Sequence, residues 1–334
     1  MKLPLRVLTW HVHGNYLLYL SQARVEFLLP VAPGRPGYGG RGDVFPFPDR
    51  VVDVPAERVR DAEFDCILFQ HRSHYRDDQY TLLSDAQRAL PRIYLEHDPP
   101  QEHPTDARHP AADDDGALIV HVTPFNALMW DDGRAESRVI EHGVFTPEGV
   151  AATAELDRGI VVVNNLRKRG RRLGLDVFER MRREAPLDLV GMDSESVGGL
   201  GEIDPRRLAE FSARYRFFFN PIRYTSLGLA VIEAMMIGLP IVGLATTEMA
   251  TVVEDGVSGH VATDPAKLVE PMRELARDRG LALEMGRRAR RAALDRFGVG
   301  RFAREWEEAF ATVVGRPAGG RTAVAPGTAT RAMA

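Results

Sequence analysis

Two features of the stretch from Phe217 to Gly259 are suited to binding a charged ligand. Leu227, Gly228 and Leu229 stand at the expected start of a helix, where backbone N–H groups have no partner within the helix and Gly228 has no side chain to keep an anion away. These residues predict a phosphate site. Glu233 follows in the same apolar helix, where an ionised carboxylate is costly unless hydrogen-bond donors meet it.

The spacing from Thr225 to Glu233 fits a ligand that has a sugar, a diphosphate and a ribose in a row. Eight residues of helix span about 12 Å at roughly 1.5 Å per residue. The hydroxyls of a ribose would supply the two donors that Glu233 needs. The alternative for Glu233 is a buried carboxylate whose partners are neighbouring amides.

These residues require a strand, a helix and a second strand in succession. Phe217 to Asn220 predict the end of a buried strand, and Ser226 is the expected N-cap of the helix. Gly238 and Pro240 end the helix, and Ile241 to Leu244 form the next strand. In such a unit the ligand lies beyond the carboxyl end of the first strand.

This stretch resembles the donor-binding segment of the retaining GT-B glycosyltransferases of family 4. The pattern matches at Pro221, Leu227-Gly228-Leu229, Glu233-Ala234-Met235, Gly238-Leu239-Pro240 and Glu254-Asp255-Gly256. The resemblance implies that Glu233 binds the donor ribose. Thr225 stands where the family has a Glu that usually contacts the transferred sugar.

Composition limits the classes of protein that the chain can belong to. A length of 334 residues suggests about two domains, and 44% hydrophobic residues are ample for two cores. The net charge of -4 and the pI near 6.2 give no reason to expect a nucleic-acid partner. Cys66, in an apolar run, is the single cysteine, and no apolar run reaches membrane-spanning length. We therefore expect a cytoplasmic protein, with a peripheral membrane contact left open.

The first half of the chain alternates short apolar segments with helical ones. The expected strands are Leu5 to Trp10, Val25 to Val31, Cys66 to Gln70, Arg92 to Leu95, Ala117 to His121 and Arg138 to Glu141. A helix begins at Tyr16, and the loop before it contains Gly14. Gly14 either lets the backbone approach a ligand across the cleft or simply forms the turn.

His97 is the histidine with the clearest expected role. It follows the strand that ends at Leu95, at the carboxyl end of the sheet. Family-4 enzymes often have a histidine at the end of this strand, so the resemblance implies that His97 faces the reacting sugar. Glu96 and Asp98 are expected to raise its pKa or to orient it. The alternative is a hydrogen-bonded loop histidine.

Nine of the ten histidines lie between His11 and His142, so a metal site must be considered. The segment from Glu96 to His109 has suitable ligand types but no His-x-x-x-His or paired Cys spacing. We therefore expect no metal and no cofactor besides the donor. His71 and His74 are expected to line the cleft or to lie on the surface.

The second half opens with the expected strand Gly159 to Val163 after a hinge at Thr146 to Leu156. The loop that follows is similar to the family's Gly-Arg-Leu and Lys-Gly segment, with Asn165 in place of the Arg and Arg169 near the Lys position. The resemblance implies that Arg169 and Lys168 neutralise the departing diphosphate. The alternative is a solvated basic turn.

Thr246 and Thr247 replace a Gly-Gly that family members often have near the donor. Their hydroxyls would line the pocket or cap the helix Met249 to Glu254. Further helices are expected at Pro205 to Tyr215, Lys267 to Arg277, Leu281 to Arg296 and Phe302 to Val313.

The resemblance implies an α/β fold of the GT-B type, with two Rossmann-like, doubly wound domains that face a cleft. Residues 1–150 would form the acceptor-side domain and residues 151–297 the domain that binds the nucleotide sugar. Residues 298–315 would be a helix crossing back to the first domain, and residues 316–334 a disordered tail.

The resulting hypothesis is transfer of a sugar from a nucleotide sugar to a glycan, lipid-linked or small-molecule acceptor. The resemblance implies that the transfer retains the configuration and needs no metal. This is a transferase of the EC 2.4 class. Its catalytic residues would be His97, Arg169 and Lys168. Its donor site would consist of Glu233, Thr225, Ser226, Leu227, Gly228, Leu229, Asn165, Gly14, Thr246 and Thr247. The rival hypothesis is a non-catalytic protein on the same fold that binds a nucleotide sugar or a glycan.

Overall fold

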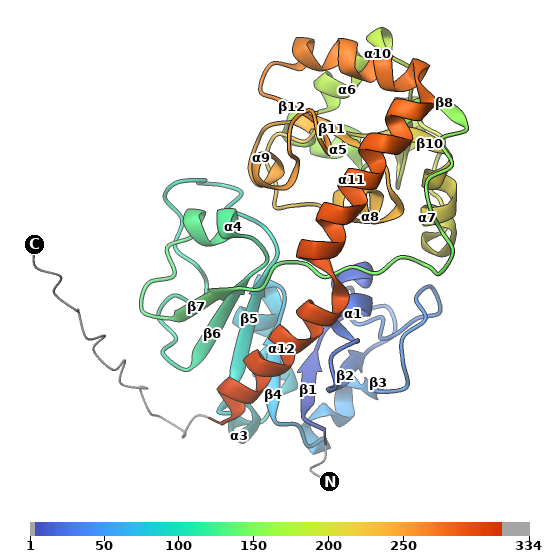
Figure 1. The fold of residues 1–334 in the computed structure, drawn as a ribbon. Coiled ribbons are helices and arrows are strands. Elements are labelled where there is room, and N and C mark those ends of the chain that lie inside the picture. Colours follow the sequence, from blue (N-terminus) through green and yellow to red (C-terminus); the bar gives the residue numbers. More distant parts are fainter. Residues whose placement is uncertain (1–3, 316–334) are drawn as a thin grey trace, which may run out of the picture.

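The chain folds into two α/β domains, each built on a parallel sheet. A pair of long helices connects the two domains (Figure 1). The structure, a computed structural model, describes residues 4–315. The disordered tail expected at residues 316–334 lies outside the described residues.

The first domain is built on a seven-stranded sheet in the order β3-β2-β1-β4-β5-β6-β7, with every neighbouring pair parallel. The strands are β1 (Arg6–Thr9), β2 (Glu26–Val31), β3 (Val51–Pro55), β4 (Cys66–Phe69), β5 (Arg92–Glu96), β6 (Ala117–His121) and β7 (Glu136–Val139). Side chains alternate between two buried faces: Val7 and Phe27 lie under α1 (Gly14–Leu20), and Leu8 and Ile67 lie in a separate cluster opposite. Burial of both faces is expected for a parallel sheet.

The second domain is built on a five-stranded parallel sheet in the order β12-β11-β10-β8-β9. The strands are β8 (Leu156–Val162), β9 (Leu187–Val190), β10 (Tyr215–Asn220), β11 (Ile241–Leu244) and β12 (Gly259–Ala262). The helices that pack on one or other face of this sheet are α6 (Leu175–Glu184), α7 (Pro205–Ala213), α8 (Leu229–Ile237), α10 (Val269–Arg277) and α11 (Arg279–Phe297).

Short helices complete the two domains. They are α2 (Gln79–Leu82), α3 (Asp85–Arg88), α4 (Pro124–Met129), α5 (Leu166–Arg169) and α9 (Met249–Val252), with single turns η1 (Ala56–Asp61), η2 (His74–Asp78), η3 (Gly170–Leu173), η4 (Ser194–Val197) and η5 (Pro265–Leu268).

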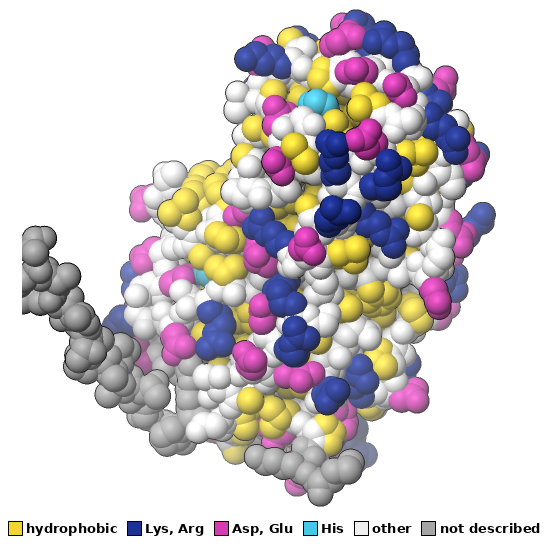
Figure 2. All heavy atoms as spheres, viewed as in Figure 1, with side chains coloured by type: hydrophobic (Ala, Val, Ile, Leu, Met, Phe, Trp, Pro, Cys, Tyr) yellow, Lys and Arg dark blue, Asp and Glu magenta, His cyan; other side chains and the backbone are white. Residues whose placement is uncertain are grey.

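Helix α12 (Val299–Val314) follows α11 after Gly298 and crosses back to the first domain, as predicted (Figure 1). It packs on α1, β4 and β5 through the buried rings of Phe302, Trp306 and Phe310. One hydrophobic cluster therefore runs from the first sheet through α1 and α12 to α8 and α11. The outer surface of α11 carries exposed Arg287, Arg288 and Arg291, and Figure 2 shows basic side chains along this helix.

Two edge strands were missed by the sequence analysis. β3 has a Pro and an Asp among its five residues, and β12 begins with Gly and His. Each lies at the edge of its sheet and is only partly buried, so neither has the continuous apolar run that marks an inner strand.

Candidate active site

The carboxyl edges of the two sheets face each other across a cleft. In each sheet the strand order reverses at one point, between β1 and β4 in the first domain and between β8 and β10 in the second, and such a point is where α/β proteins bind ligands. Hydrogen bonds connect the two edges. The Tyr224 hydroxyl donates to the Pro100 carbonyl at 2.9 Å, and the Thr225 hydroxyl donates to Asp98 Oδ1 at 3.3 Å.

Helix α8 points its amino end into this region. Its N-cap is Gly228, not Ser226 as predicted; the hydroxyl of Ser226 is buried and has no hydrogen-bond partner among the described residues. Within residues 4–315, the backbone N–H groups of Leu227, Gly228 and Leu229 donate no hydrogen bond. A Cβ built on Gly228 would meet no atom within 4 Å, so the space before these groups is open. An anion would find both free donors and room here.

The carbonyl of Leu227 is hydrogen-bonded to His142, which follows the last strand of the first sheet. His142 Nε2 lies 3.0 Å from it, which requires the proton to be on Nε2. Burial lowers the pKa of His142 to about 4, so the ring is neutral at neutral pH.

The basic loop after β8 lies at the same edge. Asn165 is the N-cap of α5 and has a φ of +53°, and its N–H donates to the Met192 carbonyl at 2.7 Å. Lys168 and Arg169 are exposed, and within residues 4–315 neither side chain has a hydrogen bond or an ion pair. Arg169 is close enough to His13 to contribute to lowering the pKa of that histidine. Arg169 therefore faces the first domain with its charge unneutralised.

His97 follows β5 at the carboxyl edge of the first sheet, as predicted. Its Nε2 is 3.0 Å from Gln70 Oε1, and the amide nitrogen of Gln70 donates to Thr9 Oγ1 at 2.9 Å and to the Trp10 carbonyl at 3.0 Å. Because that nitrogen is committed as a donor, Gln70 offers His97 an acceptor. His97 therefore carries its proton on Nε2, which leaves Nδ1 as an acceptor for a ligand hydroxyl.

Glu96 and Asp98 were expected to raise the pKa of His97 or to orient it; the predicted rise is wrong, and the hydrogen-bond partner of the ring is Gln70. Burial, with His13 and His142 nearby, lowers this pKa well below 6.5. Glu96 turns away: its Oε1 accepts the Asp98 N–H at 3.0 Å, and its Oε2 lies 3.3 Å from His109. His97 is therefore a neutral group at neutral pH.

The sequence analysis missed His13, and it placed Asp98 beside His97 without predicting its contact with Thr225. His13 lies at the start of α1, and its ring centroid is 4.4 Å from that of His97. Burial lowers the pKa of His13, and the Asp98 carboxylate opposes this effect. The one available signal was the position of His13 in the loop after the first strand. The cleft thus contains His13, His97 and Asp98 from the first domain opposite Thr225 and Arg169 from the second.

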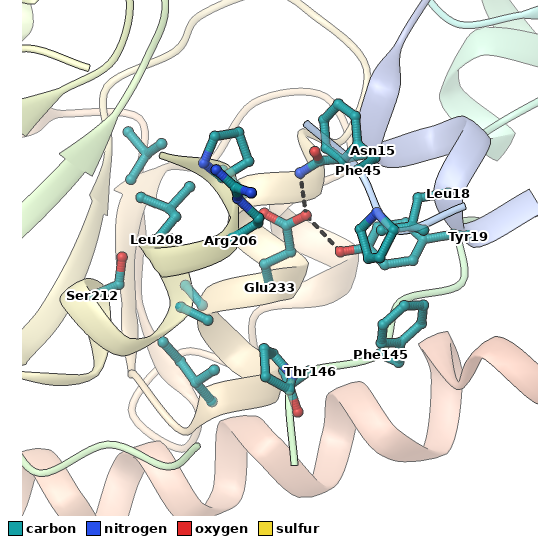
Figure 3. A pocket seen from close by; sticks show the side chains of 18 of the residues that line it. Asn15, Leu18, Tyr19, Phe45, Phe145, Thr146, Arg206, Leu208, Ser212 and Glu233 are labelled. Carbon is teal, nitrogen blue, oxygen red and sulfur yellow. Dashed lines mark hydrogen bonds between the residues drawn. The ribbon is translucent and has the colours of Figure 1, made fainter. Parts of the chain in front are cut away.

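Glu233 is held by two donors from the first domain (Figure 3). Asn15 Nδ2 and the Tyr19 hydroxyl, both on α1, each donate to Glu233 Oε1 at 2.8 Å. Burial raises the pKa of Glu233, and these two hydrogen bonds oppose that rise. Among residues 4–315, no hydrogen bond reaches Oε2. Of the two alternatives for Glu233, the structure shows an amide partner, accompanied by a phenol, and leaves one oxygen free.

A cavity of about 310 Å³ adjoins Glu233 and is lined mostly by apolar side chains from both domains (Figure 3). Leu18 and Phe45 come from the first domain, Phe145 from the linker, and Leu208 and Phe218 from the second domain. Its charged lining groups are Glu233 and Arg206, and Arg206 is paired with Asp204 at 2.7 Å. The cavity suits a flat or apolar group joined to whatever binds Glu233.

Two other predicted donor residues, Gly14 and Thr246, have structural partners, and a third, Thr247, has an unusual backbone conformation. A Cβ on Gly14 would lie 2.0 Å from the Phe45 ring, so packing alone explains this glycine. The Thr246 hydroxyl donates to the Ile222 carbonyl at 3.1 Å, and Glu248 is the N-cap of α9, so the capping alternative for Thr246 and Thr247 is wrong. Thr247 has a φ of +50°, a backbone conformation that favours glycine.

His74 is neither cleft lining nor surface, in contrast to the prediction. It is buried and stacks on Trp10 with 4.5 Å between ring centroids, and burial lowers its pKa to about 4. Within residues 4–315, no group of three or more His, Cys, Asp or Glu side chains is arranged to hold a metal ion. In the same part of the chain, no helix has the length and apolar character needed to cross a membrane.

Comparison with solved structures supports the fold. Sucrose-phosphate synthase from Thermosynechococcus elongatus is 15% identical with a TM-score of 0.67, over 92% of this chain and 99% of that chain. HepE from Anabaena, in complex with UDP and glucose, is 14% identical with a TM-score of 0.68, over 92% and 100%. AviGT4, a glycosyltransferase involved in avilamycin A biosynthesis, is 16% identical with a TM-score of 0.60, over 93% and 98%.

Residues 157–278 match the family described as "Glycosyl transferases group 1". No curated protein sequence matches the chain. The matched segment runs from the second residue of β8 through β12 and includes the basic loop and α8, which form the second-domain side of the cleft. The chain thus has the GT-B fold, and its residues 157–278 match the family "Glycosyl transferases group 1".

Proposed function

We propose that the protein transfers a sugar from a nucleoside-diphosphate sugar to an acceptor hydroxyl, with retention of configuration and without a metal ion. The observation that carries this proposal is that two free groups of the second domain face the first domain. The unpaired amino end of α8 follows Thr225, which is hydrogen-bonded to Asp98, and the unneutralised Arg169 acts on His13. Free N–H donors and a free cation suit a diphosphate, and a leaving diphosphate gains charge as the glycosidic bond breaks.

In the proposed pose, the diphosphate lies on Gly228 and Leu229 with Lys168 and Arg169 beside it. The ribose hydroxyls donate to Glu233, and the base enters the cavity next to it. UDP is present in the structures of several neighbours, among them HepE and the pneumococcal O-GlcNAc transferase GtfA. We propose a nucleotide of this kind as the ligand of Glu233.

The transferred sugar would lie between the diphosphate and the first domain. His97 Nδ1 would accept a hydrogen bond from one of its hydroxyls, and the Asp98 carboxylate from another. As the bond to the phosphate breaks, the sugar develops oxocarbenium character. The departing phosphate oxygen would accept the proton of the acceptor hydroxyl on the same face, which retains the configuration.

The acceptor, a glycan, a lipid-linked or a small molecule, would reach this point from the first-domain loops. We propose the cytoplasm as its location, in keeping with a single cysteine that is buried and free. No cofactor besides the donor is proposed.

The test is incubation of the purified protein with UDP-, GDP-, ADP- and dTDP-sugars, with nucleoside diphosphate release measured in EDTA and in Mg²⁺. Release that is equal in both conditions is the expected result. NMR of the product then reports its anomeric configuration, which we expect to match that of the donor.

Thr225 and Asn165, which depart from the family pattern, favour one rival, a protein that binds nucleotide sugars without turnover. Binding of a donor with no release, in the presence of a panel of glycan and alcohol acceptors, would identify that rival. Absence of binding to every member of the panel would contradict both functions.

A further inference from the structure

We infer that Asn15 and Tyr19 are positioning residues for the donor nucleotide: they fix the Glu233 carboxylate from the first domain, so that the ribose site of the second domain is complete only when the two domains are together. This inference rests on the proposed function, because it takes Glu233 as the acceptor of the ribose hydroxyls.

The first argument is the geometry of the carboxylate. Asn15 and Tyr19 both donate to Oε1, each at 2.8 Å, and no described residue donates to Oε2 (Figure 3). Two donors on one oxygen fix the rotation of the carboxylate about its last side-chain bond. The other oxygen is left unpaired on the wall of the cavity, where a ribose hydroxyl would donate to it.

The second argument is that Tyr19, and the helix α1 that carries both donors, are themselves held in place. Tyr19 is buried on α1, and its ring meets the Phe145 ring of the linker edge-on at 5.2 Å. Helix α1 packs against α12, the helix that returns from the second domain. A carboxylate oriented by rigid partners loses less conformational freedom when a ligand binds.

The third argument concerns charge. The titratable groups that line the cavity with Glu233 are Tyr19 and Arg206. Burial and the nearby Glu233 raise the pKa of Tyr19, so its hydroxyl stays a donor at any physiological pH, and Asn15 does not titrate. Arg206 is engaged by Asp204. Burial outweighs the two α1 donors and raises the pKa of Glu233, and these donors are the contacts that favour its ionised form, which accepts hydroxyl donors best.

The opposing interpretation is that Asn15 and Tyr19 compete with the ribose for Glu233 and keep the donor out. The two interpretations differ in sign. If the donors orient Glu233, removing one weakens nucleotide binding; if they compete, removing one strengthens it.

The experiment measures the Kd of UDP, GDP and ADP by calorimetry for the full-length wild type, Tyr19→Phe and Asn15→Ala. Loss of a hydrogen bond to a charged group predicts a Kd raised about tenfold in Tyr19→Phe for the nucleotide that binds best. Tyr80→Phe, an exposed tyrosine outside the cleft, is the matched control and should leave the Kd unchanged.

A double-variant cycle distinguishes action through Glu233 from a general structural effect. In the Glu233→Ala background, Tyr19→Phe should change the Kd less than about twofold. An equal effect in both backgrounds, or tighter binding in Tyr19→Phe, would overturn the inference. Unfolding midpoints, measured for all variants, identify any variant whose binding loss comes from lost folding, and Asn15→Ala then provides the second, independent test.

The pH dependence of binding gives a further readout. The Tyr19 hydrogen bond lowers the pKa of Glu233, so its removal should raise that pKa, and the loss of nucleotide affinity on acidification should begin at a higher pH in Tyr19→Phe than in the wild type. Superimposable profiles would contradict the inference. If the wild type binds none of the three nucleotides or their sugars, the proposed function fails; if it binds and Tyr19→Phe binds equally well, only this inference fails.

Discussion

The Asp98 carboxylate of the first domain accepts a hydrogen bond from the Thr225 hydroxyl of the second domain, with 3.3 Å between Oδ1 and Oγ1. The backbone of Asp98 is fixed on both sides, because its N–H donates to Glu96 Oε1 and its carbonyl accepts from Trp130 Nε1 at 2.9 Å. A carboxylate therefore stands beside position 225, although the residue at this position has none. Sugar hydroxyls that approach Thr225 would therefore lie next to the Asp98 carboxylate, which belongs to the first domain.

Moving the carboxylate from position 98 to position 225 tests whether activity requires only an acid near this point or specifically the acid of the first domain. Thr225→Glu alone would bring two carboxylates together, and their repulsion should lower kcat/KM at least about tenfold. Asp98→Thr alone should also lower it, because the acid is lost. The double variant, which has one acid again, should recover part of the activity. A double variant no better than the worse single variant would show that the Asp98 carboxylate is not interchangeable with one at position 225.

His97→Gln should lower kcat more than donor affinity. The expected loss in kcat is about tenfold, since one hydrogen bond to the reacting sugar is removed, while the Kd for the nucleotide should stay within about twofold. Steady-state kinetics and calorimetry check this, with the exposed His103→Gln as control. Because the pKa of His97 lies well below 6.5, its protonation should contribute no step to the rate profile between pH 6 and pH 8. An equal loss of kcat and affinity would remove its proposed role.

Arg169→Ala should reduce kcat by about a hundredfold, the size of effect seen when a group that stabilises developing charge is removed. Lys168→Ala should have a smaller effect, since no interaction places Lys168 near the first domain. The matched control is Arg183→Ala, which removes an exposed arginine on α6 and should leave kcat unchanged. Donors with better leaving groups should be less affected by the loss of Arg169; the same loss for all donors would contradict a role in stabilising the leaving group.

The buried histidines should make the protein sensitive to mild acid. The pKa values of His74 and His142 are lowered from 6.5 to about 4 in the folded protein, so the unfolded chain binds more protons between these values. The contribution of these two histidines to the free energy of unfolding is therefore at its maximum above pH 6.5. It falls by about 3 kcal/mol for each group as the pH drops from 6.5 toward 4. Urea unfolding against pH should show a shallower loss of stability in His74→Phe than in wild type or in His103→Phe. An unchanged slope in His74→Phe would contradict this origin.

The inner strands and the long helices were predictable from the sequence because each depends on local pattern. β6 and β11 have the predicted bounds, and the predicted helix at Leu281 to Arg296 lies within α11. Helix starts were less predictable. Ser226 is a good N-cap in isolation, but it is buried in the structure and the helix begins three residues later at Leu229.

The partners of the site residues were not predictable. Asn15 and Tyr19 lie 218 and 214 residues from Glu233 in sequence, and only the packing of two domains brings them together. His74 was expected to line the cleft or to lie on the surface, but packing within the first domain places Trp10 over it. Residue type and spacing indicate which groups are suited to binding a nucleotide sugar, whereas their orientation is decided by contacts that no local pattern contains.

The return of α12 makes the first domain discontinuous in the chain. Its core needs Phe302, Trp306 and Phe310, which are encoded after the whole second domain. A fragment that stops at residue 150 would expose the apolar strip that these rings cover, so it should aggregate rather than fold. During synthesis the first domain can reach its final packing only after the second domain has left the ribosome, because α12 is encoded last.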